Sequence, residues 1–194
     1  HDAIVVQENL PHSLEYAFGG DHALRVWYAD STLHWMRFDA FRARPDTAVA
    51  VIVQGEPGHS PEVALVETEA VRALILAQPL IREHRFGEAL ALLDRGDAVQ
   101  RDRNAVQYWG TSGTWRAYAW ALGGRAPEGE SLARQLLALS PTEVLTRQVL
   151  ALAIAKQRRY PEALAQLDSL DASAPGDTTT RALRAQLERM SVPR

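Results

Sequence analysis

The residues that most often carry chemistry are present in this sequence without the spacing that chemistry requires. Four of the histidines are His12, His22, His34 and His59. A zinc or iron site needs ligands that one helix or strand presents together, such as two histidines four residues apart, and these four are not so spaced. The chain has no cysteine, which excludes disulfide frameworks, thiolate metal sites and cysteine nucleophiles. We therefore predict no metal site.

Motifs for phosphate binding and nucleophilic catalysis are also incomplete. Gly19 and Gly20 are not part of a GxGxxG motif, and no GxxxxGK[ST] motif is present to hold phosphates at a helix N-terminus. Ser112 lies in a GTSGT segment that is predicted to be helical, with no identifiable His-Asp pair. Pairs of acids such as Glu67 and Glu69 are too unspecific to assign a general acid and base. We expect neither a cofactor nor catalysis within this chain.

Aromatic side chains are concentrated in one predicted helix, residues 104–122. Trp109 and Trp120 are eleven residues apart, close to three helical turns, so we predict that they pack on one core face. Tyr108 and Trp115 are seven residues apart and share another face. They are the candidates for an exposed aromatic platform that can stack on a sugar ring or a peptide aromatic.

Composition excludes several classes of protein. The 194 residues, 46% of them hydrophobic, suffice for one ordinary domain or two small ones. A net charge of -3 gives no field for nucleic-acid backbones, and no run of 18 apolar residues is present to span a membrane. Lys156 is the only lysine, an arginine bias typical of GC-rich bacterial genomes. Because the chain starts at His1 without an initiator methionine, we expect a piece of a longer protein.

Short apolar runs and turn residues alternate over the first sixty residues, which indicates a small α/β unit. A short helix is predicted over residues 11–18. The densest turn signal, GEPGHS at residues 55–60, gives the domain boundary, with one domain at 1–58 and a second at 59–194. The predicted strands are residues 3–7, 23–28, 33–38 and 48–54.

Apolar residues at spacings of three and four predict helices from residue 64 to the end. Because the strands precede the helices instead of alternating with them, the predicted fold class is α+β. The predicted helices are residues 64–83, 86–94, 104–122, 128–139, 142–157, 161–170 and 178–190.

The helical half repeats itself. Residues 124–141 and 158–175 superpose at an offset of 34 without a gap, which aligns Pro141 with Pro175. A third copy begins at His84, at an offset of 40 from the middle copy. A proline after a helix cannot continue it, so the chain turns there into the next unit.

These repeated residues resemble the tetratricopeptide repeat (TPR) family, whose unit is a 34-residue antiparallel helix pair with a small residue early in the second helix. Ala89, Gly129 and Ala163 occupy that position in the three copies. The resemblance covers about residues 70–175 and implies an α-solenoid. The predicted architecture is therefore a small N-terminal α/β unit followed by an α-solenoid of three degenerate TPR-like helix pairs. A capping helix follows, with Asp177 as its N-cap.

The resemblance also implies a groove, lined by the first helix of each pair, and a function as a non-catalytic protein-interaction scaffold with a protein or peptide partner. Alternatively, these helices only pack on the N-terminal unit. Carried over position by position, the groove residues are Gln78, Arg82, Thr114, Tyr118, Gln148 and Lys156.

A second resemblance concerns residues 2–41, which are similar to the soluble tails of bacterial membrane glycosyltransferases related to the protein O-mannosyltransferases. It implies an accessory domain that contacts acceptor or glycan on the periplasmic, or extracytoplasmic, side of the membrane. A third alternative is that the α/β unit binds a metabolite near the C-terminal ends of the first two predicted strands, at residues 5–7 and 26–28, with the helices as a dimerisation element.

Overall fold

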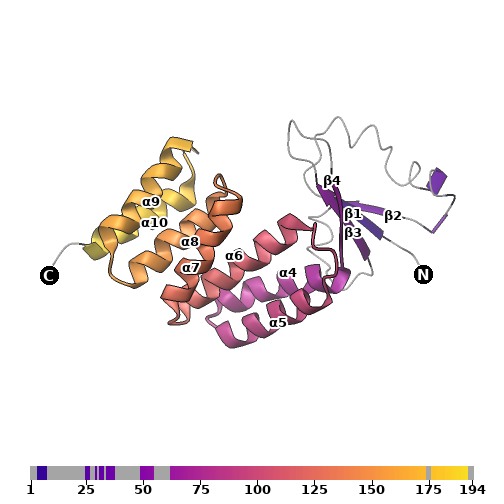
Figure 1. Cartoon of the computed structure of the whole chain (residues 1–194), viewed down its shortest axis with the longest axis horizontal. Coiled ribbons are helices and arrows are strands. Elements are labelled where there is room, and N and C mark those ends of the chain that lie inside the picture. The colour runs from indigo at the N-terminus through magenta and orange to yellow at the C-terminus, as the bar shows by residue number, and fades with distance from the viewer. Residues whose placement is uncertain are drawn as a thin grey trace. The chain divides into compact units, whose positions relative to one another are not determined.

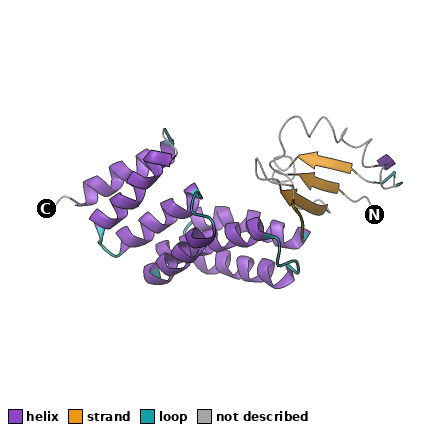
Figure 2. Ribbon diagram, turned by 45° about the horizontal axis from the view of Figure 1, so that its top comes forward, coloured by secondary structure: helices purple, strands orange, loops and turns teal. Residues whose placement is uncertain are grey.

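A computed structural model describes residues 4–7, 25–26, 29, 31–32, 34–37, 49–54, 62–173 and 176–191. The chain forms two compact units, His1–Ala77 with Ala91–Trp109 and Gln78–Leu90 with Gly110–Arg194. Short loops join the successive helices (Figure 2). The helices are α4 (Thr68–Arg82), α5 (Phe86–Val99), α6 (Val106–Leu122), α7 (Ala126–Leu139), α8 (Val144–Lys156), α9 (Tyr160–Ser173) and α10 (Thr178–Ser191), labelled in Figure 1.

The first unit contains four short strands in one sheet. Their order is β2-β1-β3-β4, with β1 parallel to both β2 and β3 and with β4 antiparallel to β3. Val5 of β1 is aligned with Trp35 of β2 on one side and with Ala50 of β3 on the other. The strands are β1 (Ile4–Gln7), β2 (His34–Arg37), β3 (Val49–Gln54) and β4 (Glu62–Val66).

The predicted fold class, α+β with an α/β unit at residues 1–58, is wrong, and the fold that the structure supports is a helical repeat. An α/β unit needs helices that cover the sheet. Before Thr68, the structure describes helical backbone only at Arg25 and Val26. These two residues fall in the predicted strand 23–28, and Val26 is 76% exposed, so its apolar side chain builds no sheet core. Apolar runs this short do not by themselves separate strand from helix.

Two further predictions for this region stay untested. The helix at residues 11–18 and the boundary at residue 58 lie outside the described residues. The strand β4 follows that boundary and leads through Glu67 directly into α4.

Polar contacts tie the start of α4 to the loop after α5 within the first unit. The backbone N–H of Glu67 donates to Gln100 Oε1 at 2.9 Å. Gln100 is buried, and its Nε2 donates to the carbonyl of Asp102 at 3.1 Å. Close packing supports the same region, because a Cβ added to Gly96 would lie only 3.0 Å from the Cβ of Ala73. Gly96 therefore allows α5 to approach α4 closely.

The turn between the two helices of each pair has the same backbone geometry in all three copies. The last turn residue adopts a left-handed conformation at His84 (φ 61°), Gly124 (φ 90°) and Arg158 (φ 63°). The N–H of the next residue donates to the carbonyl five positions earlier, which closes the helix end in the Schellman manner. These bonds run from Arg85 to Leu80, from Arg125 to Trp120 and from Arg159 to Ile154, at 2.8, 2.8 and 3.3 Å. The predicted helix-pair repeat is thereby confirmed.

The small residue early in each second helix marks a close approach. Ala89 and Ala163 are completely buried. A Cβ added to Gly129 would lie 2.7 Å from the carbonyl oxygen of Ala117 and 3.1 Å from the backbone nitrogen of Ala121. The backbones of α6 and α7 therefore meet where only a hydrogen fits.

The core of the second unit lies between the first and second helices of successive pairs. Helix α8 packs against both α7 and α9, and α10 packs against α9 (Figure 1). Full burial of an aliphatic side chain contributes about 1.5 to 3 kcal/mol. The large residues of this cluster include Val149, Leu150, Ile154, Leu167, Leu170 and Leu187.

Helix α10 begins at the predicted N-cap. The backbone N–H of Thr180 donates to Asp177 Oδ2 at 2.6 Å, which satisfies one of the free donors of the first turn. Hydrogen bonds from the Thr180 side chain and backbone are the main causes that hold the pKa of Asp177 below its ordinary value. Most of the outward residues of α10 are polar, as at the end of a repeat array.

Candidate partner-binding face

Buried polar side chains join consecutive first helices. Thr114 Oγ1 of α6 lies 2.7 Å from Thr146 Oγ1 of α8. Gln148 Nε2 of α8 donates to Thr180 Oγ1 of α10 at 2.9 Å and to Asp177 Oδ2 at 2.8 Å. Thr114 and Gln148 are 34 residues apart, as are Thr146 and Thr180, so one contact recurs between two pairs of helices. Because buried polar atoms need partners, these bonds fix α6, α8 and α10 beside one another.

Thr114 and Gln148 were predicted to line the groove. They are only 3% and 7% exposed, and the hydrogen bonds above hold them between helices. A contact with a partner stays a prediction for both residues. Sequence spacing placed them on a first helix but did not show that the next first helix would cover them.

One narrow stripe of α8 is open to solvent. Leu145 is 36% exposed, Leu152 is half-buried and Lys156 is exposed. These residues are seven and four apart, so they project within a sector of about 40°. Most of the remaining helix is buried, at Thr146, Gln148, Val149, Leu150, Ala151, Ala153, Ile154 and Ala155.

The same positions are accessible on the neighbouring first helices of the second unit. On α6, Tyr118 and Leu122 are half-buried, and on α10, Met190 is 47% exposed. The turn geometry gives the register for α4, because Arg82 and Lys156 both lie two residues before the left-handed residue of their turn. We call this set the first-helix face: Gln78, Arg82, Thr111, Tyr118, Leu122, Leu145, Leu152, Lys156, Thr179, Gln186 and Met190.

Four of the six predicted groove residues occupy this face. Arg82 and Lys156 are exposed, whereas Gln78 and Tyr118 are half-buried. The turn register aligns Gln78 with Tyr118, four positions from the alignment with Thr114 that the sequence predicted. The difference arises because the first two copies are offset by 40 residues throughout, including their first helices.

The predicted aromatic platform does not form as expected. Tyr108 was predicted to be exposed, but it is 5% exposed and its hydroxyl donates to Asp97 Oδ1 at 3.0 Å. Trp115 is half-buried, with its ring centroid 5.9 Å from that of Tyr118. The hydroxyl of Tyr108 donates to the half-buried Asp97 of α5, and helical periodicity in the sequence does not predict such a contact with another helix. Ligand contact by Trp115 stays a prediction.

Trp109 and Trp120 are half-buried, so the predicted core position holds only in part. The guanidinium carbon of Arg103 lies 4.9 Å from the Trp109 ring centroid, and that of Arg125 lies 4.8 Å from the Trp120 ring centroid. Arginine planes over indole faces contribute about 0.5 to 1 kcal/mol at exposed sites. These aromatic rings are therefore partly covered by the chain's own cations.

A buried carboxylate in α7 was missed by sequence reasoning. Glu130 is 5% exposed, and Arg159 Nη1 donates to its two oxygens at 3.0 and 2.8 Å. Arg134 and Gln157 also donate to Glu130. Burial raises the pKa of Glu130, but the hydrogen bonds from Gln157, Arg159 and Arg134 outweigh this effect and lower it. The sequence contains one signal of this site, because Glu130 aligns with Leu90 and Leu164 in the other two copies.

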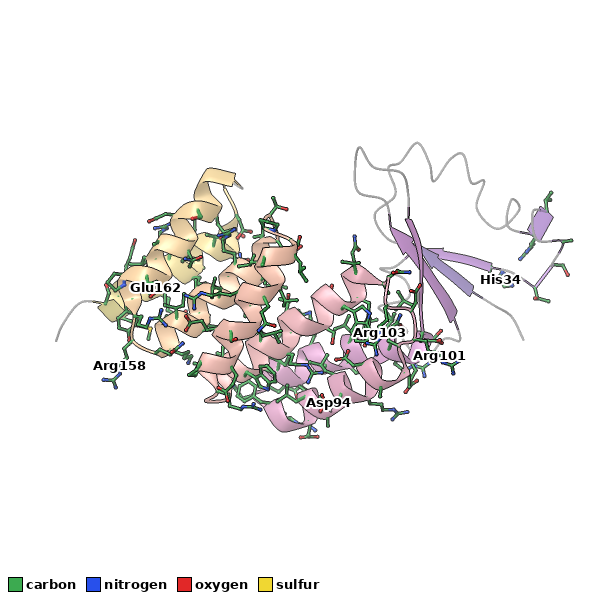
Figure 3. The ribbon with its side chains drawn as sticks, viewed as in Figure 1. His34, Asp94, Arg101, Arg103, Arg158 and Glu162 are labelled. Atoms are coloured by element: carbon green, nitrogen blue, oxygen red, sulfur yellow. The ribbon has the colours of Figure 1, made fainter. Side chains whose placement is uncertain are left out.

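Arg134 and Arg159 also bind Glu162 of α9, which is labelled in Figure 3. This network joins α7, the turn before α9 and α9 itself. Its charges are internally compensated, so we assign it a structural role.

Within the residues that the structure describes, no cluster of three metal-ligating side chains occurs. Among the same residues, no helix has both the length and the hydropathy that a membrane span requires.

The fold and its repeated turn define a TPR-like helical repeat. The chain matches no family model and no curated protein. It is similar to a solved structure titled "Crystal Structure of P58(IPK) TPR Domain at 2.5 A", with a TM-score of 0.51 and 16% sequence identity. The match covers 62% of this chain and 33% of the other, so it spans about a third of that protein's length. At this identity the likeness shows the fold alone.

The second resemblance, to tails of membrane glycosyltransferases, has no support from these comparisons. Most of residues 2–41, on which it depended, lie outside the described residues.

Proposed function

We propose that this chain is a non-catalytic protein-interaction scaffold that binds a peptide segment of a partner along the first-helix face. The observation that carries the proposal is the open stripe of α8. In a helix that is otherwise largely buried, this stripe contains the exposed Leu145, the half-buried Leu152 and the exposed Lys156, which is the only lysine of the chain.

The buried polar contacts support the proposal by keeping this face in one arrangement. Thr114, Thr146, Gln148 and Thr180 hold three first helices in register without using the open positions. A preformed surface reduces the conformational entropy lost on binding, which favours a scaffold function. The TPR-like fold, which presents a series of equivalent helices, is consistent with such a surface.

A glycan-binding accessory function has less in its favour. Sugar recognition of the predicted kind needs an exposed aromatic platform. Tyr108 is buried, and Trp115 packs against Tyr118. The burial of Tyr108 and the contact of Trp115 with Tyr118 therefore favour the scaffold function over glycan binding.

The test is a selection of peptides from a displayed library of random 12-mers on the full chain, followed by calorimetric titration of the selected peptides. Leu152→Glu places a charge on the first-helix face and should weaken binding at least tenfold. Leu139→Glu is the matched control, because Leu139 is 81% exposed on α7 and lies outside the face. Failure to select any peptide, or equal loss in both variants, would refute the proposal.

A further inference from the structure

Two cations occupy the same register position on two first helices. Arg82 ends α4 and Lys156 ends α8, each two residues before the left-handed residue of its turn. Leu122 occupies this position on α6, before Gly124. A cation in a last helical turn is favourable for the helix dipole. Because Leu122 fills the same position, however, the turn itself does not require a charge there.

The helical residues nearest these cations are not acidic, although α4 contains Glu69 at its opposite end and Glu83, which follows Arg82, pairs with Arg85. Residues 78–82, α6 and α8 contain no aspartate and no glutamate. Glu143 lies at the opposite end of α8 from Lys156. In the part of the chain that the structure describes, no ion pair is found for Arg82 or Lys156.

Three described acidic residues of the second helices pair with arginines of the chain. Glu130 and Glu162 are each bound by Arg134 and Arg159. Glu128 pairs with Arg125 at 3.1 Å. These acids are therefore neutralised by arginines of the chain, whereas Arg82 and Lys156 on the first-helix face form no ion pair with the described residues.

Apolar side chains accompany the cations on this face. Leu145 and Met190 are 36% and 47% exposed, and Tyr118 and Leu152 are half-buried. Exposed apolar side chains grouped beside charges are typical of a surface that a partner covers.

We infer that the partner segment is an acidic peptide with apolar side chains, whose carboxylates meet Arg82 and Lys156 while its apolar residues contact Tyr118, Leu145 and Leu152. This inference rests on the proposed function and names the chemistry of the ligand. Opposite charge at these two positions gives the interaction its specificity, and the apolar contacts give most of its affinity.

The test uses two displayed libraries of 12-mer peptides. Both contain apolar residues, varied at random, at the same fixed positions. In one library the charged positions are Asp or Glu, and in the other they are Lys or Arg. The full chain should enrich the acidic library at least tenfold over the basic one. Lys156→Glu and Arg82→Glu should remove or reverse this preference, and Lys156→Gln should weaken binding of the acidic peptides without reversing it.

Arg158→Glu is the matched control. Arg158 lies two residues from Lys156 but is exposed on the turn and extends away from the helices (Figure 3). This variant should keep the acidic preference, and thermal unfolding of every variant shows whether the fold is retained.

The outcomes separate the inference from the proposed function. Enrichment of basic peptides, or acidic peptides whose binding is unchanged by Lys156→Glu and Arg82→Glu, would overturn the inference. If Leu152→Glu still weakened the binding of the peptides selected in either case, the scaffold function would stand. If neither library yielded a binder, both would fall.

Discussion

Arg158 adopts a left-handed backbone conformation that costs an ordinary residue about 1 to 2 kcal/mol. Glycine avoids this cost but loses about 0.5 to 1 kcal/mol through its greater freedom in the unfolded chain. The middle copy uses Gly124 at the equivalent position. The balance therefore favours glycine at the exposed turn.

We expect Arg158→Gly to raise the free energy of unfolding by about 0.5 to 1 kcal/mol, measured by urea denaturation. Arg158→Ala retains a Cβ and should change the stability by less than about 0.5 kcal/mol. A destabilised glycine variant would show that the Arg158 side chain contributes more than its backbone costs.

Glu130 makes the stability depend on pH, because its pKa is lower in the folded chain than its ordinary value of 4.5. A carboxyl with a lowered folded pKa stabilises the fold above the unfolded pKa, and this contribution is lost as the pH falls through the folded pKa. Glu130→Gln should cost about 1.5 to 3 kcal/mol at neutral pH and reduce the loss of stability on acidification below pH 4.5.

Denaturation at several pH values measures this effect. Glu188→Gln, on an exposed position of α10, is the control and should leave the neutral-pH stability nearly unchanged. Parallel acid dependence in the chain and in Glu130→Gln would mean that other carboxyls dominate. Glu128 and Asp177, whose pKa values are also lowered, are the first such candidates.

At the scale of elements, the helix pairs depend on close backbone approach at one position. Gly129→Ala would bring a Cβ to 2.7 Å from the Ala117 oxygen. We expect a loss of about 1 to 3 kcal/mol, despite the better helix propensity of alanine. Gly110→Ala is the matched control in α6, where nothing lies within 4 Å of the added Cβ. It should stabilise the chain by up to about 1 kcal/mol, as judged from denaturation midpoints.

The contact between α6 and α8 uses two hydroxyls that are almost fully buried. Thr146→Val should cost about 1 to 3 kcal/mol, because it leaves the Thr114 hydroxyl without this partner. Thr114→Val should cost less stability in the Thr146→Val variant than in the unchanged chain. A double-mutant cycle measures this difference. Strict additivity would show that the two hydroxyls do not interact.

At the scale of the whole molecule, each element of the second unit is stabilised by its neighbours. Helix α10 buries Leu187 against the core and supplies Asp177 and Thr180 to Gln148. A chain that ends at residue 175 should lose at least about 3 kcal/mol, because it exposes apolar surface and unpairs a buried amide.

Thermal unfolding should show a lower midpoint for this truncated chain, and size-exclusion chromatography should show concentration-dependent association through the uncovered surface. Deleting only residues 192–194 is the control. An unchanged midpoint after removal of α10 would contradict its role as the stabilising end of the array.

The sequence by itself determined the features that depend on local chemistry. Helical periodicity, the offsets of 34 and 40, the small residues at Ala89, Gly129 and Ala163, and the cap at Asp177 all follow from neighbours within a few turns. These features are sufficient to predict the helix pairs, and the family resemblance that they support implied four residues of the candidate face, Gln78, Arg82, Tyr118 and Lys156.

Only the tertiary structure decided which positions of each helix remain open. Thr114 and Gln148 have the same local pattern as open residues, but the next first helix covers them, and Tyr108 and Glu130 acquire partners from other elements. Three of the four short apolar runs near the N-terminus form the strands β1, β2 and β3, whereas Arg25 and Val26 of the fourth are helical, and the helices described from Thr68 onward form a repeat. The physical reason is that a periodicity of 3.6 residues fixes the face of a residue on its own helix, whereas packing between helices fixes what that face meets.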